Sequence, residues 1–407
     1  MSEPDPAAQD HARTLVASYC FPPYSDTAGI VAAKRVRERG EPVDVIANAM
    51  DSIRQQDSSL TQIGGDLVRR FTALRTPSAF SSWRSISTYA ERGYDVALRW
   101  EAEQGRYERV YSRAQFAASH FLAGRYKHAR PETTWVAEFS DPLSHDVLGA
   151  ARVAPVGDDR LAEMVPSWVE SAGFALPDNE NMNEWCEVVT FALADRIIFT
   201  NELQRDFMLE RCHDPRLARR AAEVSVVSPH PTLPRSYYGL VRSQYAVDPD
   251  RVNIGYFGNF YANRGVGLLL DALAGLPRGL RDRLLVHVFT SKVDELAESV
   301  GDAGLADVVR VNPYVPYLEF LNLADRMDVL LVNDAVTPPG GTVNPFLPSK
   351  WSDYRGSSTP VWAIVEEGSS LSRMEGIRFR SPVEHLSALQ QVLAELATSE
   401  SAAVPVS

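Results

Sequence analysis

Short apolar segments alternate with helical ones along this chain of 407 residues, and the alternation occurs in two separate blocks. The first block opens with an apolar run at 14–20, a turn-rich loop at 22–29, a helical pattern at 30–39 and an apolar run at 43–47. A strand, a loop, a helix and a strand in this order form the crossover unit of a parallel sheet. The pattern therefore predicts an α/β fold.

The same order of elements continues through the first half of the chain. We predict further strands at 134–139, 196–200 and 224–227, and helices at 187–195 and from Glu202. His120 lies on another helical pattern and is interpreted as structural. The polar segment 153–185 is interpreted as a loop-rich decoration, with a lid or binding loop as the alternative.

A proline-rich segment separates the two blocks. Residues 228–234 contain three prolines, and proline restrains its own φ and the residue before it. We therefore predict two doubly wound, Rossmann-like domains over 1–235 and 236–380, and a helical tail over 381–407 that packs back on the first domain. In the second block we predict strands at 252–257, 284–289, 328–332 and 360–365, and helices at 265–273, 317–324 and 349–355.

The composition excludes several classes of protein. With 41 Lys+Arg against 53 Asp+Glu, the net charge of -12 argues against nonspecific binding to nucleic acid or to an anionic membrane. The three cysteines lack the spacing of a metal site. Apolar runs are far shorter than the roughly 20 residues of a membrane helix, and no signal peptide is recognised. We expect a cytoplasmic protein; peripheral membrane contact and the oligomeric state stay open.

The strand at 252–257 leads into a loop of small and polar residues. Asn259 and Arg264 lie in this loop, directly before a helix. A loop between the carboxyl end of a parallel strand and a helix N-terminus is a common phosphate site in α/β folds. Arg264 is therefore a candidate phosphate ligand, and the alternative is an ordinary surface arginine.

A second candidate site follows the strand at 328–332. Ser349 is predicted to cap a helix that carries Lys350 in its first turn and Asp353 in the next. A lysine at a helix N-terminus opposes the helix dipole, and a bound diphosphate would remove this conflict. Asp353 would accept hydrogen bonds from sugar hydroxyls. The alternative is a capped surface helix with solvated Lys and Asp side chains.

These segments together resemble the donor-binding half of GT-B glycosyltransferases, in particular the family 4-like group. Arg264 matches a cationic residue of that family, whereas Asn259 replaces a second one. Asp353 matches the second acid of a Glu-x7-Glu signature, and its first acid falls near Pro345, which is not acidic. Lys350 fits a Pro-Ser-Lys variant of the same helix. Tyr314 and Val315 match a segment whose backbone contacts the nucleotide base.

The first half of the chain also resembles this family. The loop 24–29, which ends at Gly29, matches a small-residue loop beneath the donor phosphates and acceptor. Asp141 falls where the family often has an active-site histidine, and it is a candidate acceptor-orienting group or base. Its alternative is a turn-forming residue before Pro142. His145 is a weaker candidate for the same site.

The resemblance implies two domains that face each other across a cleft, and a metal-independent transferase. It would move a sugar from a nucleoside-diphosphate donor, such as a UDP- or GDP-sugar, to a polysaccharide, a glycolipid precursor or a small molecule, as in bacterial polysaccharide biosynthesis. We expect no metal and no separate cofactor. The alternatives are a sugar-nucleotide epimerase and a non-catalytic binding module. The expected catalytic residues are Asp141, Arg264 and Lys350, and the expected donor contacts are Gly29, Asn259, Arg264, Tyr314, Val315, Asn344, Ser349, Lys350 and Asp353.

Overall fold

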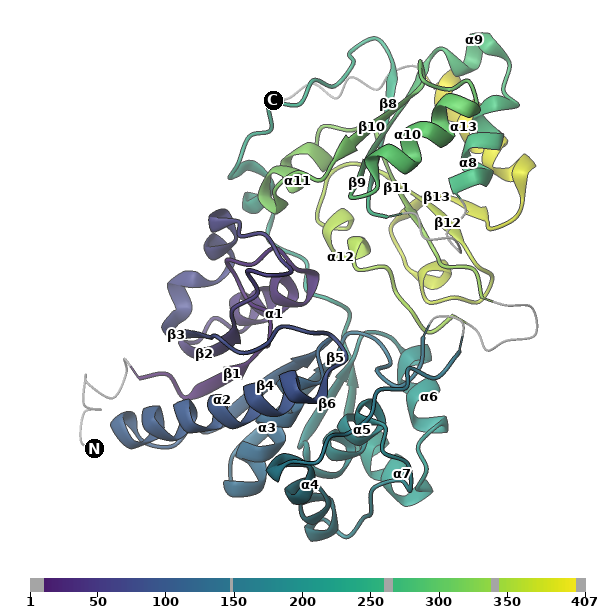
Figure 1. Ribbon diagram of the computed structural model, residues 1–407. Helices are drawn as coiled ribbons and strands as arrows, with labels where there is room; N and C mark the ends of the chain where they lie inside the picture. The colour runs from purple at the N-terminus through teal and green to yellow at the C-terminus, as the bar shows by residue number, and fades with distance from the viewer. Residues whose placement is uncertain (1–10, 147–148, 260–265, 338–343, 400–407) are drawn as a thin grey trace, which may run out of the picture. The chain divides into compact units, whose positions relative to one another are not determined.

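The computed structural model describes residues 11–146, 149–259, 266–337 and 344–399 (Figure 1). The chain divides into two compact units, Met1–Pro231 and Thr232–Ser407. The division falls inside the proline-rich segment that the sequence predicts as a linker, close to the predicted boundary at residue 235. Each unit has its own parallel sheet, so the predicted fold of two Rossmann-like α/β domains is confirmed.

The first unit contains a seven-stranded sheet in the order β3-β2-β1-β4-β5-β6-β7. All neighbouring strands are parallel, and Thr14 of β1 lies between Val43 of β2 and Arg109 of β4. Strand β1 starts the sheet in the centre, from which the chain winds first to one edge and then to the other. The strands are β1 Thr14–Ala17, β2 Val43–Asn48, β3 Val68–Leu74, β4 Arg109–Ala114, β5 Thr134–Phe139, β6 Arg196–Phe199 and β7 Ser225–Val227.

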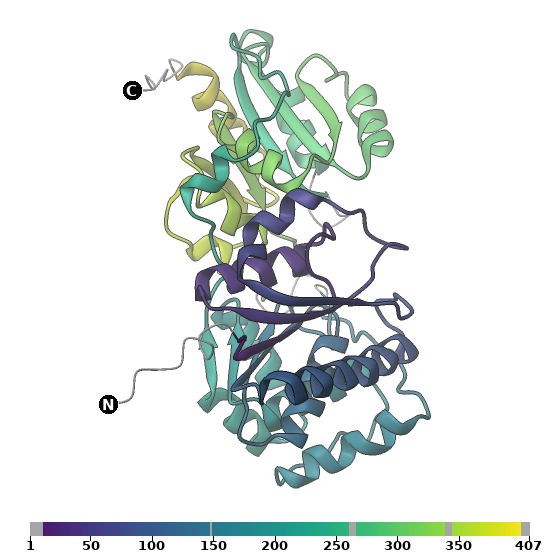
Figure 2. The same ribbon diagram turned by 90° about the vertical axis from the view of Figure 1, so that its left-hand side faces the viewer.

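Helices cover both faces of this sheet (Figure 2). On β4, Ser112 bonds His120 of α3 at 2.8 Å, whereas the adjacent Tyr111 bonds Glu138 on the opposite face, where α1 contributes Arg35. The predicted structural role of His120 is thus matched by a fully buried position. The helices are α1 Thr27–Arg39, α2 Trp83–Gln104, α3 Ala118–Ala129, α4 Arg160–Ser171, α5 Met182–Leu193, α6 Glu202–Glu210 and α7 Pro215–Glu223.

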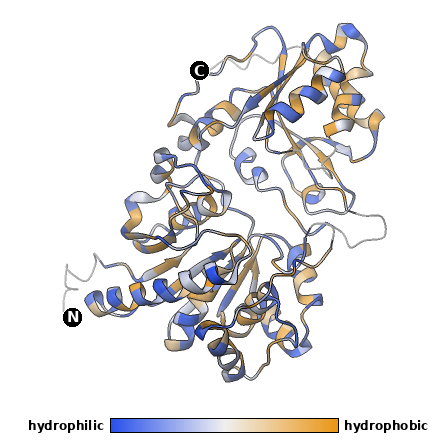
Figure 3. Cartoon of the chain, in the orientation of Figure 1, coloured by the Kyte–Doolittle hydropathy of each residue, from blue (hydrophilic) through white to orange (hydrophobic). Residues whose placement is uncertain are grey.

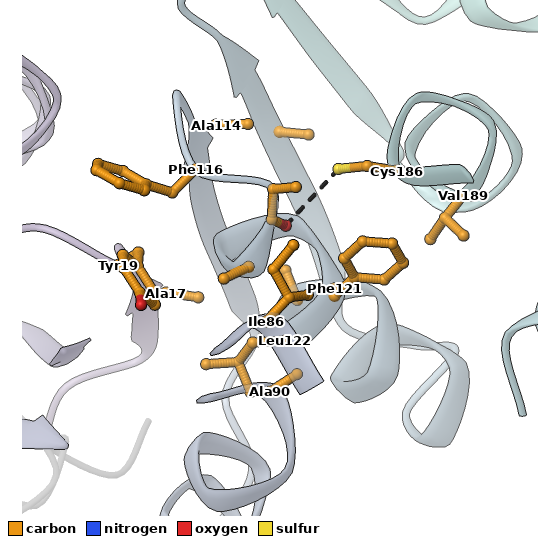
Figure 4. Packing of buried hydrophobic residues seen from close by; sticks show 14 of the residues in the cluster. Ala17, Tyr19, Ile86, Ala90, Ala114, Phe116, Phe121, Leu122, Cys186 and Val189 are labelled. Atoms are coloured by element: carbon orange, nitrogen blue, oxygen red, sulfur yellow. Dashed lines mark hydrogen bonds between the residues drawn. The ribbon is translucent and has the colours of Figure 1, made fainter. Parts of the chain in front are cut away.

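The core of the first unit is centred on α3 (Figure 4). Phe121 and Leu122 pack among Ile86 of α2 and Val189 of α5, and the Cys186 thiol contacts the carbonyl oxygen of Ala117 at 3.7 Å. Each of these side chains is at most 2 % exposed. Because buried apolar surface stabilises by roughly 25 cal/mol per Å², this cluster holds the three helices on the sheet.

The segment 153–185, predicted as loop-rich, contains helix α4 and the start of α5. Leu161, Val165 and Trp168 of α4 recur at helical spacing and are buried. Asp159 caps the helix by accepting a hydrogen bond from Ala162 N. Pro166 lies inside α4, and a proline normally indicates a helix break, which explains the incorrect prediction.

The second unit contains a six-stranded parallel sheet in the order β10-β9-β8-β11-β12-β13. The central strands β9, β11 and β12 are buried along their whole length, whereas the edge strands β10 and β13 are partly exposed. The apolar residues of these strands are orange in Figure 3. The strands are β8 Val252–Phe257, β9 Leu284–Thr290, β10 Val309–Pro313, β11 Val329–Asn333, β12 Val361–Val365 and β13 Ile377–Pro382. The helices are α8 Val266–Ala274, α9 Arg278–Arg281, α10 Val293–Asp302, α11 Tyr317–Ala324, α12 Lys350–Tyr354 and α13 Leu386–Thr398.

Helix α13 belongs to the second unit. Its apolar side chains, including Leu389, Leu393 and Leu396, join Leu269 and Leu273 of α8 in one buried cluster. The sequence predicts that this helix packs back on the first domain, but its apolar face is instead covered by α8 and β13. None of the helices within the described residues has the length and apolar character needed to cross a bilayer.

Candidate functional site

Aromatic side chains hold α11 and α12 against the carboxyl end of β8. The ring of Phe257, the last residue of β8, lies 4.7 Å from the ring of Phe320 on α11. The backbone N–H of Phe257 donates to the hydroxyl oxygen of Tyr354 on α12 at 3.2 Å. These contacts place α12, with Lys350 and Asp353, at the sheet edge where α/β folds bind ligands.

Lys350 and Asp353 form the charged part of this site. The Lys350 ammonium lies 4.4 Å from the centre of the Phe320 ring and 3.8 Å from Asp353 Oδ2. Asp353 Oδ1 accepts a hydrogen bond from the Tyr317 hydroxyl at 2.6 Å. The carboxylate is only 6 % exposed and the lysine side chain 32 %. The lysine charge is therefore held by a carboxylate and a ring face while part of the side chain stays accessible.

This geometry differs from the alternative interpretation of α12 as a surface helix and from the predicted cap. Asp353 is buried and bonded to a phenol, so it is not the solvated acid of a surface helix; burial and Asp353 together hold the pKa of Tyr317 well above its usual range. Ser349 does not cap α12 with its side chain. Its backbone is helical (φ -59°, ψ -29°), whereas a capping residue is extended so that its oxygen reaches the first N–H groups.

The loop residues Asn259 and Asn344 are engaged in local structure. Asn259 Oδ1 accepts hydrogen bonds from Thr290 Oγ1 at 2.8 Å and from Ser291 N at 3.1 Å, which ties the end of β8 to the end of β9. The buried Asn344 donates from Nδ2 to the Ala335 carbonyl at 2.9 Å. Its Oδ1 accepts from Phe346 N at 2.9 Å. Both amides thus shape loops at the carboxyl edge.

Three further predicted residues have simple placements. Tyr314 and Val315 directly follow β10, at the same edge of the sheet, and the Tyr314 side chain is 50 % exposed. Arg264 lies outside the described residues, so its predicted role as a phosphate ligand stays a prediction.

The second unit also has two acidic residues at the ends of neighbouring strands that sequence reasoning missed. Asp334 follows β11 and Glu366 follows β12, two strands that are neighbours. Asp334 Oδ2 accepts from Glu366 N at 3.0 Å and from Ser369 Oγ at 2.6 Å. Glu366 Oε1 accepts from the Thr337 hydroxyl, and its Oε2 is buried with no hydrogen bond in the described part of the chain. The available signal was an acid within two residues of the end of each of two predicted strands.

In the first unit, Gly29 lies in the first turn of α1. A Cβ atom there would lie 3.0 Å from Phe21 Cα and 3.1 Å from the Cys20 carbonyl carbon. The glycine therefore permits close packing of α1 on the loop after β1. Asp26 caps this helix through Ala28 N at 2.8 Å and pairs with Arg54 at 2.6 Å. The helix N-terminus thus already has an anionic partner.

The loop after β5 contains Asp141 and His145. Asp141 is half-buried in a turn before Pro142. Glu187 of α5 supports this loop, because its Oε1 accepts from Leu143 N and Ser144 N, both at 2.9 Å. Burial raises the pKa of Glu187 to about 7 despite these bonds. Sequence reasoning missed Glu187, although a carboxylate at the start of a predicted buried helix is an unusual feature.

A buried charged cluster holds the start of the linker on the first unit. Arg113 Nη2 lies 3.0 Å from His230 Nε2, and Arg35 donates to the carbonyl oxygens of Ser228 and Pro229. Glu138 accepts from Arg35 at 2.9 Å. Burial and the nearby cations lower the pKa of His230 well below its usual range, so His230 is a neutral acceptor that anchors the linker.

Two other features bear on ligands. A pocket of about 320 Å³ lies between α1 and β3 and is lined by apolar side chains such as Phe21, Leu60 and Phe71. In the described residues, no group of three or more His, Cys, Asp or Glu side chains is arranged to hold a metal ion.

Comparisons with known proteins identify the fold. No family model and no curated protein sequence matches the chain. It is similar to the solved structure of HepE from Anabaena with UDP and glucose (13% identity, 96% of this chain and 90% of that chain, TM-score 0.57). It is also similar to sucrose-phosphate synthase from Thermosynechococcus elongatus (13% identity, 94% and 91%, TM-score 0.58). The chain has the GT-B fold.

A UDP-N-acetylglucosamine 2-epimerase has a comparable likeness, with 11% identity over 96% of this chain and 88% of that chain and a TM-score of 0.54. Glycosyltransferases and epimerases therefore share this architecture, and the fold alone does not distinguish them. That distinction depends on the side chains of the site.

Proposed function

We propose that the protein is a glycosyltransferase that uses a nucleoside-diphosphate sugar. The observation that carries the proposal is the partly accessible Lys350 at the carboxyl edge of the second sheet. This edge is where doubly wound folds bind nucleotides. The GT-B fold supports the same assignment, since HepE, a structure of this fold, was solved with UDP and glucose.

The chemistry requires stabilisation of the leaving diphosphate. Cleavage of the sugar–phosphate bond places negative charge on the diphosphate, and a fixed cation lowers the energy of that transition state. Lys350 supplies such a cation, held in place by Asp353 and by the Phe320 ring. We assign Arg264 as a second cation on the same diphosphate. Transfer of this kind needs no metal ion, and we propose a family 4-like, metal-independent enzyme.

The remaining assignments follow from position. Tyr314 and Val315 lie at the edge where a nucleotide base would be held, and the exposed Tyr314 ring offers a stacking surface. Asp141, in the loop after β5, would orient the acceptor hydroxyl. The expected acceptor is a polysaccharide, a glycolipid precursor or a small molecule, and the expected nucleotide is UDP or GDP.

A sugar-nucleotide epimerase is the second candidate, and one observation favours it. Asp334 and Glu366 are acidic residues at the ends of two neighbouring strands; the Asp334 carboxylate accepts the Glu366 backbone N–H, and Glu366 Oε2 is buried without a hydrogen bond among the described residues. Carboxyl groups in different environments can hold different protonation states and act as acid and base, and an epimerase would use these two in that way. An Asp334→Asn, Glu366→Gln variant that keeps donor turnover would remove this candidate.

Calorimetric titration with UDP, GDP and ADP tests the donor site. Lys350→Ala should weaken the preferred nucleotide by about 10- to 100-fold, because a charge-assisted hydrogen bond contributes roughly 1.5–3 kcal/mol. Lys292→Ala is the matched control, since this lysine of the same unit pairs with Glu295 and is 47 % exposed. Equal affinities in both variants would contradict the proposal. Chromatography of the products from a nucleotide sugar then distinguishes transfer, epimerisation and binding without turnover.

A further inference from the structure

Ser144, His145 and Glu187 form a continuous hydrogen-bonded chain of side chains. The first two lie in the loop after β5, and Glu187 lies on α5. Ser144 Oγ lies 2.8 Å from Glu187 Oε2 and 2.9 Å from His145 Nδ1. Glu187 Oε1 already accepts two backbone N–H groups. No hydrogen bond reaches His145 Nε2 from the described residues. The serine hydroxyl therefore connects a buried carboxyl group to one nitrogen of the imidazole.

The ionised carboxylate fixes the direction of every bond in this chain. An ionised Glu187 can only accept, so the single proton of the Ser144 hydroxyl points to Glu187 Oε2. The serine oxygen must then accept from His145, so His145 carries its proton on Nδ1. His145 Nε2 is left as a proton acceptor.

Protonation of Glu187 reverses the chain. Oε1 is occupied by two N–H donors, so the added proton resides on Oε2 and is donated to Ser144 Oγ. The serine hydroxyl then donates to His145 Nδ1, which requires the imidazole proton to be on Nε2. The site gains one proton from solvent, at Glu187. His145 loses a proton at Nδ1 and gains one at Nε2, and so stays neutral throughout.

We propose that Glu187, acting through Ser144, is a positioning residue that sets the tautomer of His145, so that Nε2 accepts a proton only when Glu187 is ionised. The final use of this acceptor rests on the proposed function: His145 Nε2 would take the proton of the sugar acceptor's hydroxyl. The tautomer switch itself does not depend on that function and has its own measurement.

Burial and the surrounding charges place the tautomer change of His145 near neutral pH. Burial, with a smaller contribution from Glu184 on the same helix, raises the pKa of Glu187 to about 7. Burial and then Arg211 lower the pKa of His145, so its imidazole is neutral where Glu187 titrates. The other charged groups that act on this chain are Asp146 and Arg152 on the loop side of His145, and Asp214 beside Cys212, whose thiol also faces Glu187.

Nitrogen-15 NMR of the histidine side chains tests the proposal on the full chain. His145→Gln identifies the His145 signals by their loss. Between pH 8.5 and pH 5.5, we expect the wild-type His145 Nε2 signal to change from the unprotonated to the protonated type, with the opposite change at Nδ1. Glu187→Gln, whose amide can donate to Ser144 but cannot ionise, should hold the proton on Nε2 at every pH.

Two more variants complete the design. Ser144→Ala should abolish the pH response while the protein stays folded by circular dichroism. Glu184→Gln, the matched control on the same helix, should keep the switch and lower its midpoint, because it removes a neighbouring negative charge. A wild-type His145 with the same tautomer at both pH values, or a Glu187→Gln protein with the proton on Nδ1, would overturn the proposal. A normal switch in a protein without transferase activity would contradict the proposed function alone.

Discussion

Individual buried charges in this protein are accompanied by specific partners. Asp353 has the Tyr317 phenol and the Lys350 ammonium, and Glu187 has three donors from residues 143 and 144. Removal of one partner destabilises the folded state, because a buried polar group without a hydrogen bond costs roughly 1–3 kcal/mol. The residues of the candidate site therefore affect stability as well as chemistry.

Glu187 makes the stability of the first unit depend on pH. Its folded-state pKa of about 7 is raised above the ordinary value of 4.5. The folded state therefore binds the proton more tightly, so this contribution is complete below about pH 4.5 and is lost as the pH rises through 7. The loss is about 3 kcal/mol. Urea unfolding of wild type and Glu187→Gln at pH 5 and pH 8 measures it. Between these two pH values, the difference in unfolding free energy between the two proteins should shift by about 2–3 kcal/mol, and a constant difference would contradict the prediction.

Tyr317→Phe removes the phenol that donates to Asp353. We expect the free energy of unfolding of the second unit to fall by roughly 1–3 kcal/mol, because the carboxylate loses a buried hydrogen bond. Tyr314→Phe is the control, since that side chain is 50 % exposed, and it should change stability by less than about 0.5 kcal/mol. Denaturant unfolding of both variants measures the effect. Unchanged stability of Tyr317→Phe would show that Asp353 does not depend on Tyr317.

At the scale of elements, close packing of helices depends on single glycines. A Cβ at Gly93 of α2 would lie 2.7 Å from Leu122 Cδ2, inside the buried cluster of α3. A Cβ at Gly124 of α3 would lie 2.9 Å from Val189 Cγ1 of α5. Without side chains at these two positions, α2 and α5 approach α3 closely enough to bury it. The core shown in Figure 4 results from this approach.

Gly93→Leu should therefore destabilise the first unit by about 1–3 kcal/mol through overpacking. Gly267→Leu is the matched control, because no atom of the described residues outside α8 lies within 4 Å of the position of a Cβ at this helical glycine. The stability of the Gly267→Leu protein should rise or stay constant, because leucine has a higher helix propensity than glycine. Thermal unfolding followed by circular dichroism compares the two. Similar losses of stability in both variants would show that the close approach of α2 to α3 at Gly93 does not limit the size of the side chain there.

The burial of helices and strands also explains which of them are predicted from the sequence. Strands β5 and β8 and helix α11 have the predicted bounds, because their apolar runs or periodic faces are buried and end at turn residues. Strand β3 was missed, since an edge strand that is half-exposed carries charged residues such as Arg69 and Arg70. Helix α4 was missed because of Pro166. A local sequence pattern indicates which residues are buried, but it does not indicate which residues of other elements they contact.

Much of the candidate site also depends on tertiary partners. The sequence places Lys350 and Asp353 one turn apart on a helix, as observed. It does not predict Tyr317 and Phe320 beside them, since these residues come from a helix that precedes β11. It likewise gives no indication that Glu187 bonds the loop after β5, 43 residues earlier in the chain. Contacts across such separations are set by the fold.

At the scale of the whole molecule, two separate cores predict two unfolding events. Buried clusters lie within Met1–Pro231 and within Thr232–Ser407, and each unit has its own sheet. Domains with independent cores unfold as separate cooperative units when the interface between them is weak. Hydrogen exchange followed by mass spectrometry reports the protection of each unit separately.

The proposed donor site then predicts which unit a nucleotide stabilises. UDP or GDP at 100 times its dissociation constant should stabilise the second unit by about 2.7 kcal/mol, which raises its transition by about 5–10 °C. Peptides from Thr232–Ser407 should gain protection, while those around β2 and β3 should not. At the same ligand concentration, Lys350→Ala should reduce this gain to about 0.4–1.4 kcal/mol, because binding is 10- to 100-fold weaker, and Lys292→Ala should retain the full gain. Stabilisation confined to the first unit would move the nucleotide site away from Lys350, because a ligand raises the stability of the unit that binds it.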